Sequence, residues 1–267
     1  MLKRITNIES FIRSNVPFVP EIGIILGTGL GGFADIIENK TEIDYSDIPD
    51  FPVSTVEGHA GKLIFGTISG KKVVAMKGRF HYYEGYSTQE VTIPVRVMSR
   101  LGVKYLFVSN AAGGVNPGFN VGDLMVITDH INLIPNPLIG KNLDEFGVRF
   151  PSMNEAYDKE LVLKADNISE GFGLKLRYGC YVGTTGPSLE TPKEYRYFNA
   201  IGADAVGMST TPEVIVAVHC GMKVFGTSVI TNSGLSDQPS THEEIQGEGA
   251  KAQKKMIKLF SEILQRI

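Results

Sequence analysis

The chain has 267 residues, two cysteines and a net charge of −3. The slight acidic excess argues against a polybasic surface for nucleic acid or anionic membranes, and two cysteines form no disulfide framework. No apolar run approaches the ~20 residues of a membrane span. We therefore expect a cytoplasmic protein with no nucleic-acid partner and no membrane partner. The one unusual count is glycine, with 30 residues, which makes the positions of the glycines informative.

Short runs rich in β-branched residues, bounded by glycine or asparagine, predict strands that are buried on both faces. They cover residues 22–26, 63–68, 73–76, 105–108, 124–127 and 224–230. Apolar residues at steps of three and four predict helices, and a polar segment at 136–150 predicts a long loop. The predicted helices cover 89–101, 155–168 and 241–267. Strands and helices alternate with no linker between them, so we expect an α/β fold in a single domain over residues 1–267.

The glycine-rich segment GTGLGG at residues 27–32 follows the first predicted strand and matches the spacing of the dinucleotide fingerprint. That fingerprint also needs a strand ending in an acidic residue about 20 residues later. Residues 42–50 are acidic but show no clear strand, so an NAD-dependent oxidoreductase stays a remote alternative. We instead expect backbone N–H groups and the Thr28 hydroxyl to bind phosphate here, with a purely structural tight turn as the other interpretation.

Polar residues follow four further strand-like runs, at the end where open α/β sheets bind their ligands. Arg79, His81 and Tyr83 lie in the first of these segments. The planar Arg79 guanidinium suits phosphate oxygens, although a surface turn with aromatic packing is the alternative. The segment SNAAGG at 109–114 allows close approach of the backbone to a ligand, or is only a tight turn.

The other two segments carry groups that suit a heterocycle. Glu190 stands just before Pro192, so its carboxylate either caps a helix or accepts a hydrogen bond from a ligand N–H. Asn232 combines a donor and an acceptor in one amide, which suits recognition of a heterocycle edge.

Other chemistries have no signature in the chain. The sequence has no G-x-S-x-G elbow, no H-E-x-x-H and no Walker-type G-x-x-x-x-G-K-[ST]. The five histidines lack the spacing of metal ligands, so we expect no metal site. His219 lies in an apolar helical segment and is expected to be a packing residue. A solvated helix face is expected for Lys251, Lys254, Lys255 and Lys258.

Ten motifs in order along the chain resemble the trimeric purine nucleoside phosphorylases of the nucleoside phosphorylase and methylthioadenosine phosphorylase family. They are LGTGLG at 26–31, GHAG at 58–61, GRFH at 78–81, NAAGG at 110–114, DHIN at 129–132, GP at 186–187, ET at 190–191, VGMS at 206–209, TN at 231–232 and HEE at 242–244. The resemblance covers nearly the whole chain. It implies a mixed central β-sheet flanked by helices and a homotrimer with shared pockets.

The resemblance also implies a role for each matching residue. The phosphate would be bound by Thr28, His59, Arg79, His81, Ala111 through its backbone, and Ser209. The purine would be bound by Leu189, Glu190, Val206, Gly207 and Asn232, and the ribose by Tyr83, Met208, His242 and Phe150 of a neighbouring subunit. His81, Glu190 and Asn232 would be the catalytic residues. The family uses no cofactor, and inorganic phosphate is its co-substrate.

The implied reaction is phosphorolysis of a purine nucleoside to the free base and (deoxy)ribose 1-phosphate. Methylthioadenosine phosphorylases, the alternative within the family, usually carry Asp where this chain has Asn232 and an apolar residue where it has His242. Asn232 with Glu190 suits 6-oxopurines, so we expect inosine and guanosine as substrates. A nucleoside-binding protein without catalysis is a second alternative.

The chain departs from the family pattern at three places. Thr28 stands where nucleoside-cleaving members usually have Ser, which keeps the hydroxyl. Leu189 stands where the family usually has Phe or Tyr, which removes an aromatic edge beside the purine. The segment 233–241 is shorter than in mammalian members.

Overall fold

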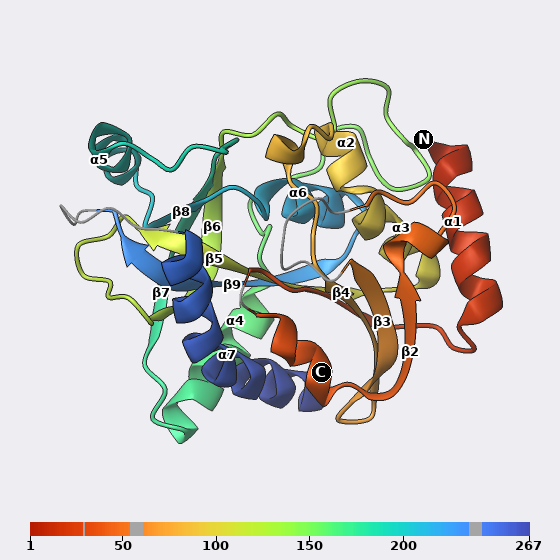
Figure 1. Cartoon of the computed structure of the whole chain (residues 1–267), viewed down its shortest axis with the longest axis horizontal. Coiled ribbons are helices and arrows are strands. Elements are labelled where there is room, and N and C mark those ends of the chain that lie inside the picture. The colour runs from red at the N-terminus through yellow and green to blue at the C-terminus, as the bar shows by residue number, and fades with distance from the viewer. Residues whose placement is uncertain (29, 54–60, 235–241) are drawn as a thin grey trace.

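Nine strands form one mixed sheet at the centre of the computed structural model, which describes residues 1–28, 30–53, 61–234 and 242–267, with only the backbone of His242 (Figure 1). The strands are β1 (Ile22–Ile25), β2 (Glu38–Asp44), β3 (Lys62–Ile68), β4 (Lys71–Lys77), β5 (Tyr105–Gly114), β6 (Leu124–Asn132), β7 (Leu176–Gly183), β8 (Ala205–Gly207) and β9 (Lys223–Ser233). Their order across the sheet is β2-β3-β4-β1-β5-β8-β7-β6-β9, and β9 also pairs with β5.

The sheet mixes parallel and antiparallel pairs: β5 and β8 are antiparallel, whereas β7 runs parallel to both β8 and β6. β1 runs parallel to β4 and to β5, and β5 runs parallel to β9. β3 is antiparallel to both β2 and β4, and β6 is antiparallel to β9. Because β9 pairs with both β5 and β6, strands β5, β8, β7, β6 and β9 close into a ring. The predicted α/β fold with a mixed central sheet is confirmed.

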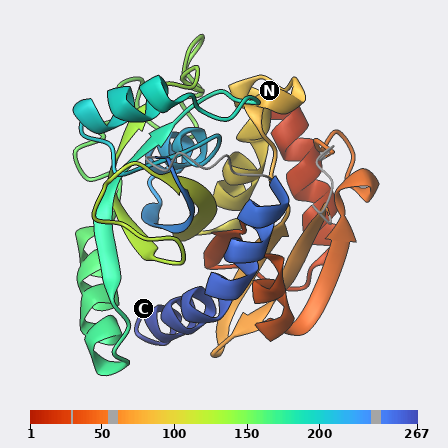
Figure 2. The same ribbon diagram turned by 60° about the vertical axis from the view of Figure 1, so that its left-hand side comes forward.

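Helices cover both faces of the sheet (Figure 1, Figure 2). One face carries α1 (Leu2–Asn15), α2 (Thr88–Val91), α3 (Ile93–Leu101) and α6 (Thr211–His219). The other carries α4 (Lys159–Gly171), α7 (His242–Gln265) and the 3-10 helix η1 (Gly31–Ile36), while α5 (Pro192–Ala200) packs beside β7 and β8. Two further 3-10 turns are η2 (Tyr45–Asp47) and η3 (Tyr82–Glu84). Along β5, Leu106 packs on the first face and Phe107 on the second, as expected for a strand that is buried on both sides.

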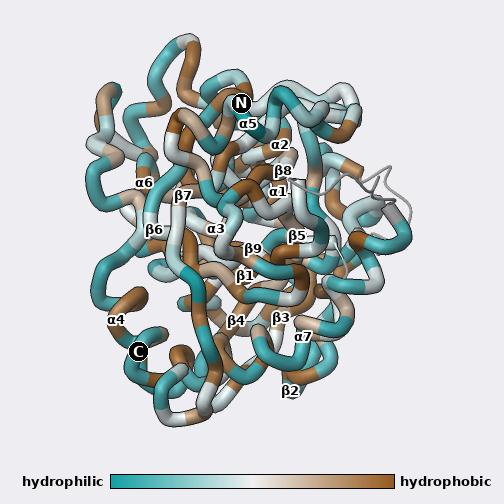
Figure 3. Tube along the Cα trace, turned by 90° about the vertical axis from the view of Figure 1, so that its left-hand side faces the viewer, coloured by the Kyte–Doolittle hydropathy of each residue, from teal (hydrophilic) through white to brown (hydrophobic). Residues whose placement is uncertain are grey.

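The outer helices are amphipathic. Figure 3 shows hydrophobic and hydrophilic residues alternating along α4 and α7. On α7, Met256, Phe260 and Ile263 are buried against the sheet. The opposite side is exposed, which confirms the predicted solvated face at Lys251, Lys254, Lys255 and Lys258. None of the helices in the described part of the chain is both long and apolar enough to cross a membrane.

All six predicted strand runs lie in strands, but α1, β2, β7 and β8 were not predicted. Strand β2 is a polar edge strand in which only Ile43 is buried. The expectation that no strand leads into the acidic residues at 42–50 is therefore wrong. This strand does not support dinucleotide binding, which requires two parallel strands joined by an α-helix. Strand β2 is antiparallel to β3 and follows β1 through a six-residue 3-10 helix.

The predicted helix over 89–101 is two helices, α2 and α3, that meet at Thr92. Pro94 stands in the first turn of α3, and proline lacks the N–H that would continue the earlier helix. The predicted helix over 155–168 begins later, because the Asp158 carboxylate accepts a hydrogen bond from the Leu161 N–H at 3.0 Å and caps α4 there.

The predicted loop at 136–150 contains no helix or strand. It is tied to the end of α6, where His219 Nε2 lies 3.2 Å from Asn142 Oδ1. The other ring nitrogen of His219, Nδ1, lies 3.4 Å from Arg96 Nη1. Burial and the Arg96 charge lower the pKa of His219, which is 4% exposed. The prediction that His219 is a packing histidine is confirmed.

Candidate functional site

One cavity opens where the parallel strands β4, β1, β5 and β9 end, as expected for a sheet of this class. Loops after β4, β1 and β7 and the strands β5, β8 and β9 supply its walls. Most of the predicted site residues line it, namely Thr28, Arg79, His81, Tyr83, Ala111, Leu189, Glu190, Val206, Gly207, Met208, Ser209 and Asn232. The folding of distant strand ends onto one edge therefore brings together residues that are up to two hundred positions apart in the sequence.

Three predicted residues stand apart. His59 lies outside the described residues, and so does the side chain of His242. Phe150 does not line the cavity, and its side chain is 85% exposed on the loop at 136–150.

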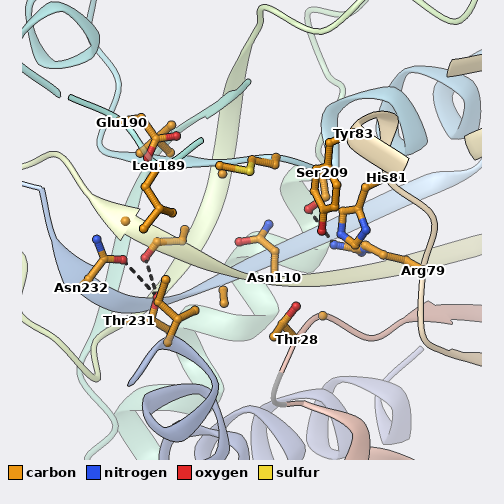
Figure 4. A pocket seen from close by; sticks show the side chains of 18 of the residues that line it. Thr28, Arg79, His81, Tyr83, Asn110, Leu189, Glu190, Ser209, Thr231 and Asn232 are labelled. Atoms are coloured by element: carbon orange, nitrogen blue, oxygen red, sulfur yellow. Dashed lines mark hydrogen bonds between the residues drawn. The ribbon is translucent and has the colours of Figure 1, made fainter. Parts of the chain in front are cut away.

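The cavity has two chemically different ends, which Figure 4 shows from close by. Arg79, His81, Tyr83 and Ser209 gather at one end. Leu189, Glu190 and Asn232 gather at the other, with Asn110 and Thr28 between the two groups.

Arg79 anchors the first end and is 1% exposed. Its Nη1 donates hydrogen bonds to Ser209 Oγ at 2.9 Å and to Thr210 Oγ1 at 3.2 Å. Its Nη2 lies 3.2 Å from Oε2 of the buried Glu213 in the first turn of α6. Burial raises the pKa of Glu213, and the Arg79 charge opposes that shift. A buried guanidinium in this setting is held in one orientation, so it can present a fixed fork to an anion.

Thr210 links the groups around Arg79. Its backbone has φ 68° and ψ −54°, a conformation that β-branched residues rarely adopt and that costs about 1–3 kcal/mol. Its Oγ1 accepts a hydrogen bond from Asn110 Nδ2 at 2.9 Å and lies 3.2 Å from Ser209 Oγ. Strain of this kind persists where the surroundings over-determine the conformation, and it tends to cluster at functional sites.

His81 is oriented by a carboxylate. Its Nδ1 lies 2.9 Å from Glu84 Oε1, and its backbone N–H donates to the same oxygen at 2.8 Å. An ionised carboxylate can only accept hydrogen bonds, so Nδ1 carries a proton. The ring also stacks on Tyr83, with centroids 4.6 Å apart. Burial raises the pKa of Tyr83 to about 12, so its hydroxyl stays a neutral donor.

Glu190 at the second end is not a helix cap. The cap of α5 is Thr191, whose Oγ1 accepts a hydrogen bond from the Glu194 N–H at 3.2 Å. Glu190 instead turns toward the cavity, where Oε1 accepts a hydrogen bond from Thr184 Oγ1 at 3.3 Å. Burial raises the pKa of Glu190, and its hydrogen bonds, that from Thr184 among them, oppose that shift.

Several lining residues were not predicted as site residues. Asn110 and Thr231 lie in segments that the strand-end argument singled out, without a role. Tyr195 and Ile245 lie on helices and carried no signal in the sequence pattern. Asn232 Nδ2 donates a hydrogen bond to Tyr195 Oη at 3.3 Å, so the unpredicted Tyr195 touches a predicted residue directly.

Part of the glycine-rich turn serves packing. A Cβ atom on Gly27 would lie 2.6 Å from the Asn110 Cα, so the turn needs glycine to pass beside β5. The Gly27 N–H donates to Ser109 Oγ at 3.3 Å. The structural interpretation therefore explains this glycine.

The end of the turn is held by α7. In the amide orientation that satisfies its neighbours, the Gln253 side-chain oxygen accepts hydrogen bonds from the N–H groups of Gly32 at 2.9 Å and Phe33 at 2.8 Å. The predicted cradle of backbone N–H groups for phosphate is thus wrong at Gly27 and Gly32, whose N–H groups have partners within the protein. Thr28 does line the cavity, so its hydroxyl remains available to a ligand.

The described residues bring no three His, Cys, Asp or Glu side chains together as a metal site. Cys180 and Cys220 are both free thiols, and burial raises the pKa of each to about 11. Neither lines the cavity, as expected for cysteines that act as small packing residues.

Comparison with known proteins agrees with this geometry. The family model described as "Phosphorylase superfamily" matches residues 21–265. Purine nucleoside phosphorylase 1 of Bacillus subtilis is 54% identical over 267 residues, covering 99% of this chain and 98% of the relative.

Two solved structures of Schistosoma mansoni purine nucleoside phosphorylase superpose closely on this chain, each with a TM-score of 0.95. The complex with inosine is 45% identical and covers 99% of this chain and 96% of that one. The complex with adenosine is 44% identical and covers 99% of this chain and 97% of that one.

Proposed function

The chain belongs to the purine nucleoside phosphorylases of the phosphorylase superfamily, and from this we propose that it cleaves 6-oxopurine nucleosides, inosine and guanosine, in purine salvage. The products are the free base and (deoxy)ribose 1-phosphate. Inorganic phosphate is the co-substrate, and the reaction uses no cofactor or metal. The single domain spans residues 1–267.

The observation that carries the proposal is the division of the cavity into two ends. Arg79, His81 and Ser209 supply donors for an anion at one end. Glu190 and Asn232 supply an acceptor and a donor for a purine edge at the other. A nucleoside that spans both groups would place its glycosidic bond between phosphate and base, with Tyr83, Met208 and His242 around the sugar.

Such a site needs no protein nucleophile. Cleavage of a glycosidic bond passes through an oxocarbenium-like transition state, which an adjacent phosphate anion stabilises. The departing purine gains negative charge, and a donor at Asn232 Nδ2 toward N7 strengthens as that charge develops. A hydrogen bond to a charged group is worth about 1.5–3 kcal/mol, which corresponds to roughly 10- to 150-fold in rate when it forms only in the transition state.

The preference for 6-oxopurines follows from the same two residues. Glu190 accepts a hydrogen bond from the N1–H that inosine and guanosine carry and adenosine lacks. Methylthioadenosine phosphorylase activity is the alternative within the family. A relative has been crystallised with adenosine, so binding alone does not distinguish adenosine from inosine as a substrate. The rates of cleavage of the two nucleosides must be compared.

We propose that the active form is a cytoplasmic homotrimer in which Phe150 of one subunit enters the pocket of its neighbour. Phe150, Val148 and Ile139 are 85%, 67% and 67% exposed on the loop at 136–150, an unusual amount of apolar surface for one loop. A solution mass equal to the 29.1 kDa of one chain would contradict this assembly.

The decisive experiment is inosine cleavage with and without phosphate. We expect hypoxanthine and ribose 1-phosphate only when phosphate is present. Equal release of hypoxanthine without phosphate would indicate a hydrolase, and binding of inosine without release would indicate a binding protein. Faster cleavage of methylthioadenosine than of inosine would favour the alternative within the family. A change in nicotinamide absorbance when NAD is added would support the NAD-dependent oxidoreductase instead.

A further inference from the structure

Tyr195 joins the two purine-binding residues to each other. Its hydroxyl lies beside the Glu190 carboxylate, where burial and the Glu190 charge raise the pKa of Tyr195, and it accepts a hydrogen bond from Asn232 Nδ2 at 3.3 Å. The residue lies near the start of α5, which Thr191 caps, and it is 7% exposed. The link therefore comes from a rigid, buried element and not from a mobile loop.

Two glycines leave the space that the Tyr195 ring occupies. A Cβ atom on Gly113 would lie 3.2 Å from Tyr195 Oη and 3.4 Å from Asn232 Nδ2. A Cβ atom on Gly234 would collide with the ring itself. The surroundings thus hold the tyrosine in the position from which it reaches both purine-binding residues.

The orientation of the Tyr195 hydroxyl fixes the Asn232 amide. An ionised carboxylate can only accept, so the Tyr195 O–H turns toward the nearby Glu190 charge and the Tyr195 oxygen is left to accept from Asn232. The group of Asn232 that faces Tyr195 must then be the NH₂ and not the oxygen. An amide oxygen and nitrogen have nearly the same shape, so their placement depends on such partners.

Thr231, the other neighbour of the amide, does not fix its orientation. Its Oγ1 lies 3.3 Å from both the Ala112 carbonyl oxygen and Asn232 Oδ1, and its single proton can go to either acceptor. When the proton goes to Ala112, the Thr231 oxygen can accept from a rotated amide equally well. Tyr195 is the neighbour that fixes the amide orientation, because the Glu190 carboxylate beside its hydroxyl can only accept a hydrogen bond.

We propose that Tyr195 is a positioning residue for base selection, which holds the Asn232 amide with its N–H toward the purine and so favours 6-oxo over 6-amino bases. A 6-oxopurine offers acceptors at both N7 and O6, which suit the NH₂ group. A 6-aminopurine offers a donor at its 6-position, which suits the amide oxygen of the rotated group. This inference rests on the proposed function, because it explains the selectivity of the same pocket.

The test is the Tyr195→Phe variant, which removes the hydroxyl and keeps the ring. We expect kcat/KM for inosine to fall about tenfold and that for adenosine to change less than about threefold, because only the 6-oxo base depends on the fixed donor. The Tyr197→Phe variant is the matched control on the same helix, where the side chain is 54% exposed and does not line the pocket. Its two kcat/KM values and its melting temperature should match the wild type.

A double-mutant cycle separates positioning from general damage. If Tyr195 acts through the amide, adding Tyr195→Phe to Asn232→Ala should change kcat/KM for inosine by less than about twofold. An inosine-to-adenosine ratio that stays within about twofold of wild type in Tyr195→Phe, or fully additive losses in the cycle, would overturn the inference. A wild-type enzyme that does not cleave inosine would instead overturn the proposed function.

Discussion

Arg79 Nη2 lies 3.2 Å from Oε2 of Glu213, and the two side chains are 1% and 3% exposed. A buried ion pair adds little net stability over an apolar pair, but breaking it by removing one charge is costly. The pair therefore matters less for the strength of the fold than for the position of the guanidinium that faces the cavity.

We expect Glu213→Gln to destabilise the protein by about 3–5 kcal/mol, because the buried Arg79 charge loses its counter-charge. The KM for phosphate should rise, since the fork is no longer held toward Ser209. Chemical unfolding and phosphate titration at saturating inosine measure the two effects. Glu155→Gln is the control, because its pair with Lys159 is 71% and 73% exposed. An unchanged KM for phosphate in a folded Glu213→Gln enzyme would contradict the positioning role.

Thr210→Val tests the strained residue beside this pair. Valine has the same shape and keeps the backbone strain, but it removes the oxygen that accepts from Arg79 Nη1 and Asn110 Nδ2. Leaving buried donors without an acceptor costs about 1–3 kcal/mol, so we expect a loss of that size in unfolding free energy and weaker phosphate binding. Thr210→Ser keeps the hydroxyl and should retain phosphate affinity. Equal phosphate affinity in Thr210→Val and Thr210→Ser would contradict a role of the Thr210 hydroxyl in phosphate binding.

Asn232→Asp replaces a donor by an acceptor at the purine end of the cavity. We expect kcat/KM for inosine to fall roughly 10- to 150-fold and the preference to move toward 6-aminopurines, since a carboxylate accepts from the 6-amino group. Steady-state rates on inosine, adenosine and methylthioadenosine measure the shift. Unchanged inosine kinetics would place Asn232 away from the purine.

The pH dependence on inosine should report Glu190. Burial raises its pKa above the ordinary 4.5, so acid protonates Glu190 at a higher pH than an exposed glutamate. The protonated form no longer accepts from the purine N1–H, so kcat/KM should be intact above the raised pKa and fall as the pH drops through it. Profiles recorded at a constant concentration of phosphate dianion exclude the titration of the co-substrate. A fall in kcat/KM that occurs only at or below pH 4.5, or that is still present in Glu190→Gln, would contradict the assignment of this pH dependence to Glu190.

The sequence predicted which residues line the cavity better than it predicted the borders of the helices and strands. Arg79 and Asn232 could be found because buried strands show as apolar runs, and a polar residue just beyond such a run lies at a known edge of the sheet. Tyr195 could not, because an aromatic residue on a helix looks like packing until the tertiary structure shows what its hydroxyl reaches. The phosphate prediction for the glycine-rich turn failed in part for a related reason. Gly27 is needed because strand β5 leaves no room for a side chain there, and the sequence does not show that contact.

Helix α1 could have been predicted, because Ile5, Ile8 and Ile12 are buried at steps of three and four. Strand β8 has three residues, too few for a period to show. The break between α2 and α3 depends on Pro94, whose effect is visible in the sequence but whose exact place is set by packing.

Because the ring closes through β9, β2 is the one strand in the described part of the chain that pairs with a single neighbour and is open along its whole other side. An open strand offers unpaired N–H and C=O groups to any other extended chain, and this is a common route to aggregation. The composition of β2 lowers this risk, because Glu38, Lys40, Glu42 and Asp44 place charged side chains along the open edge. The same charges that hid the strand from a search for apolar runs are those that keep two copies of the protein from extending each other's sheet.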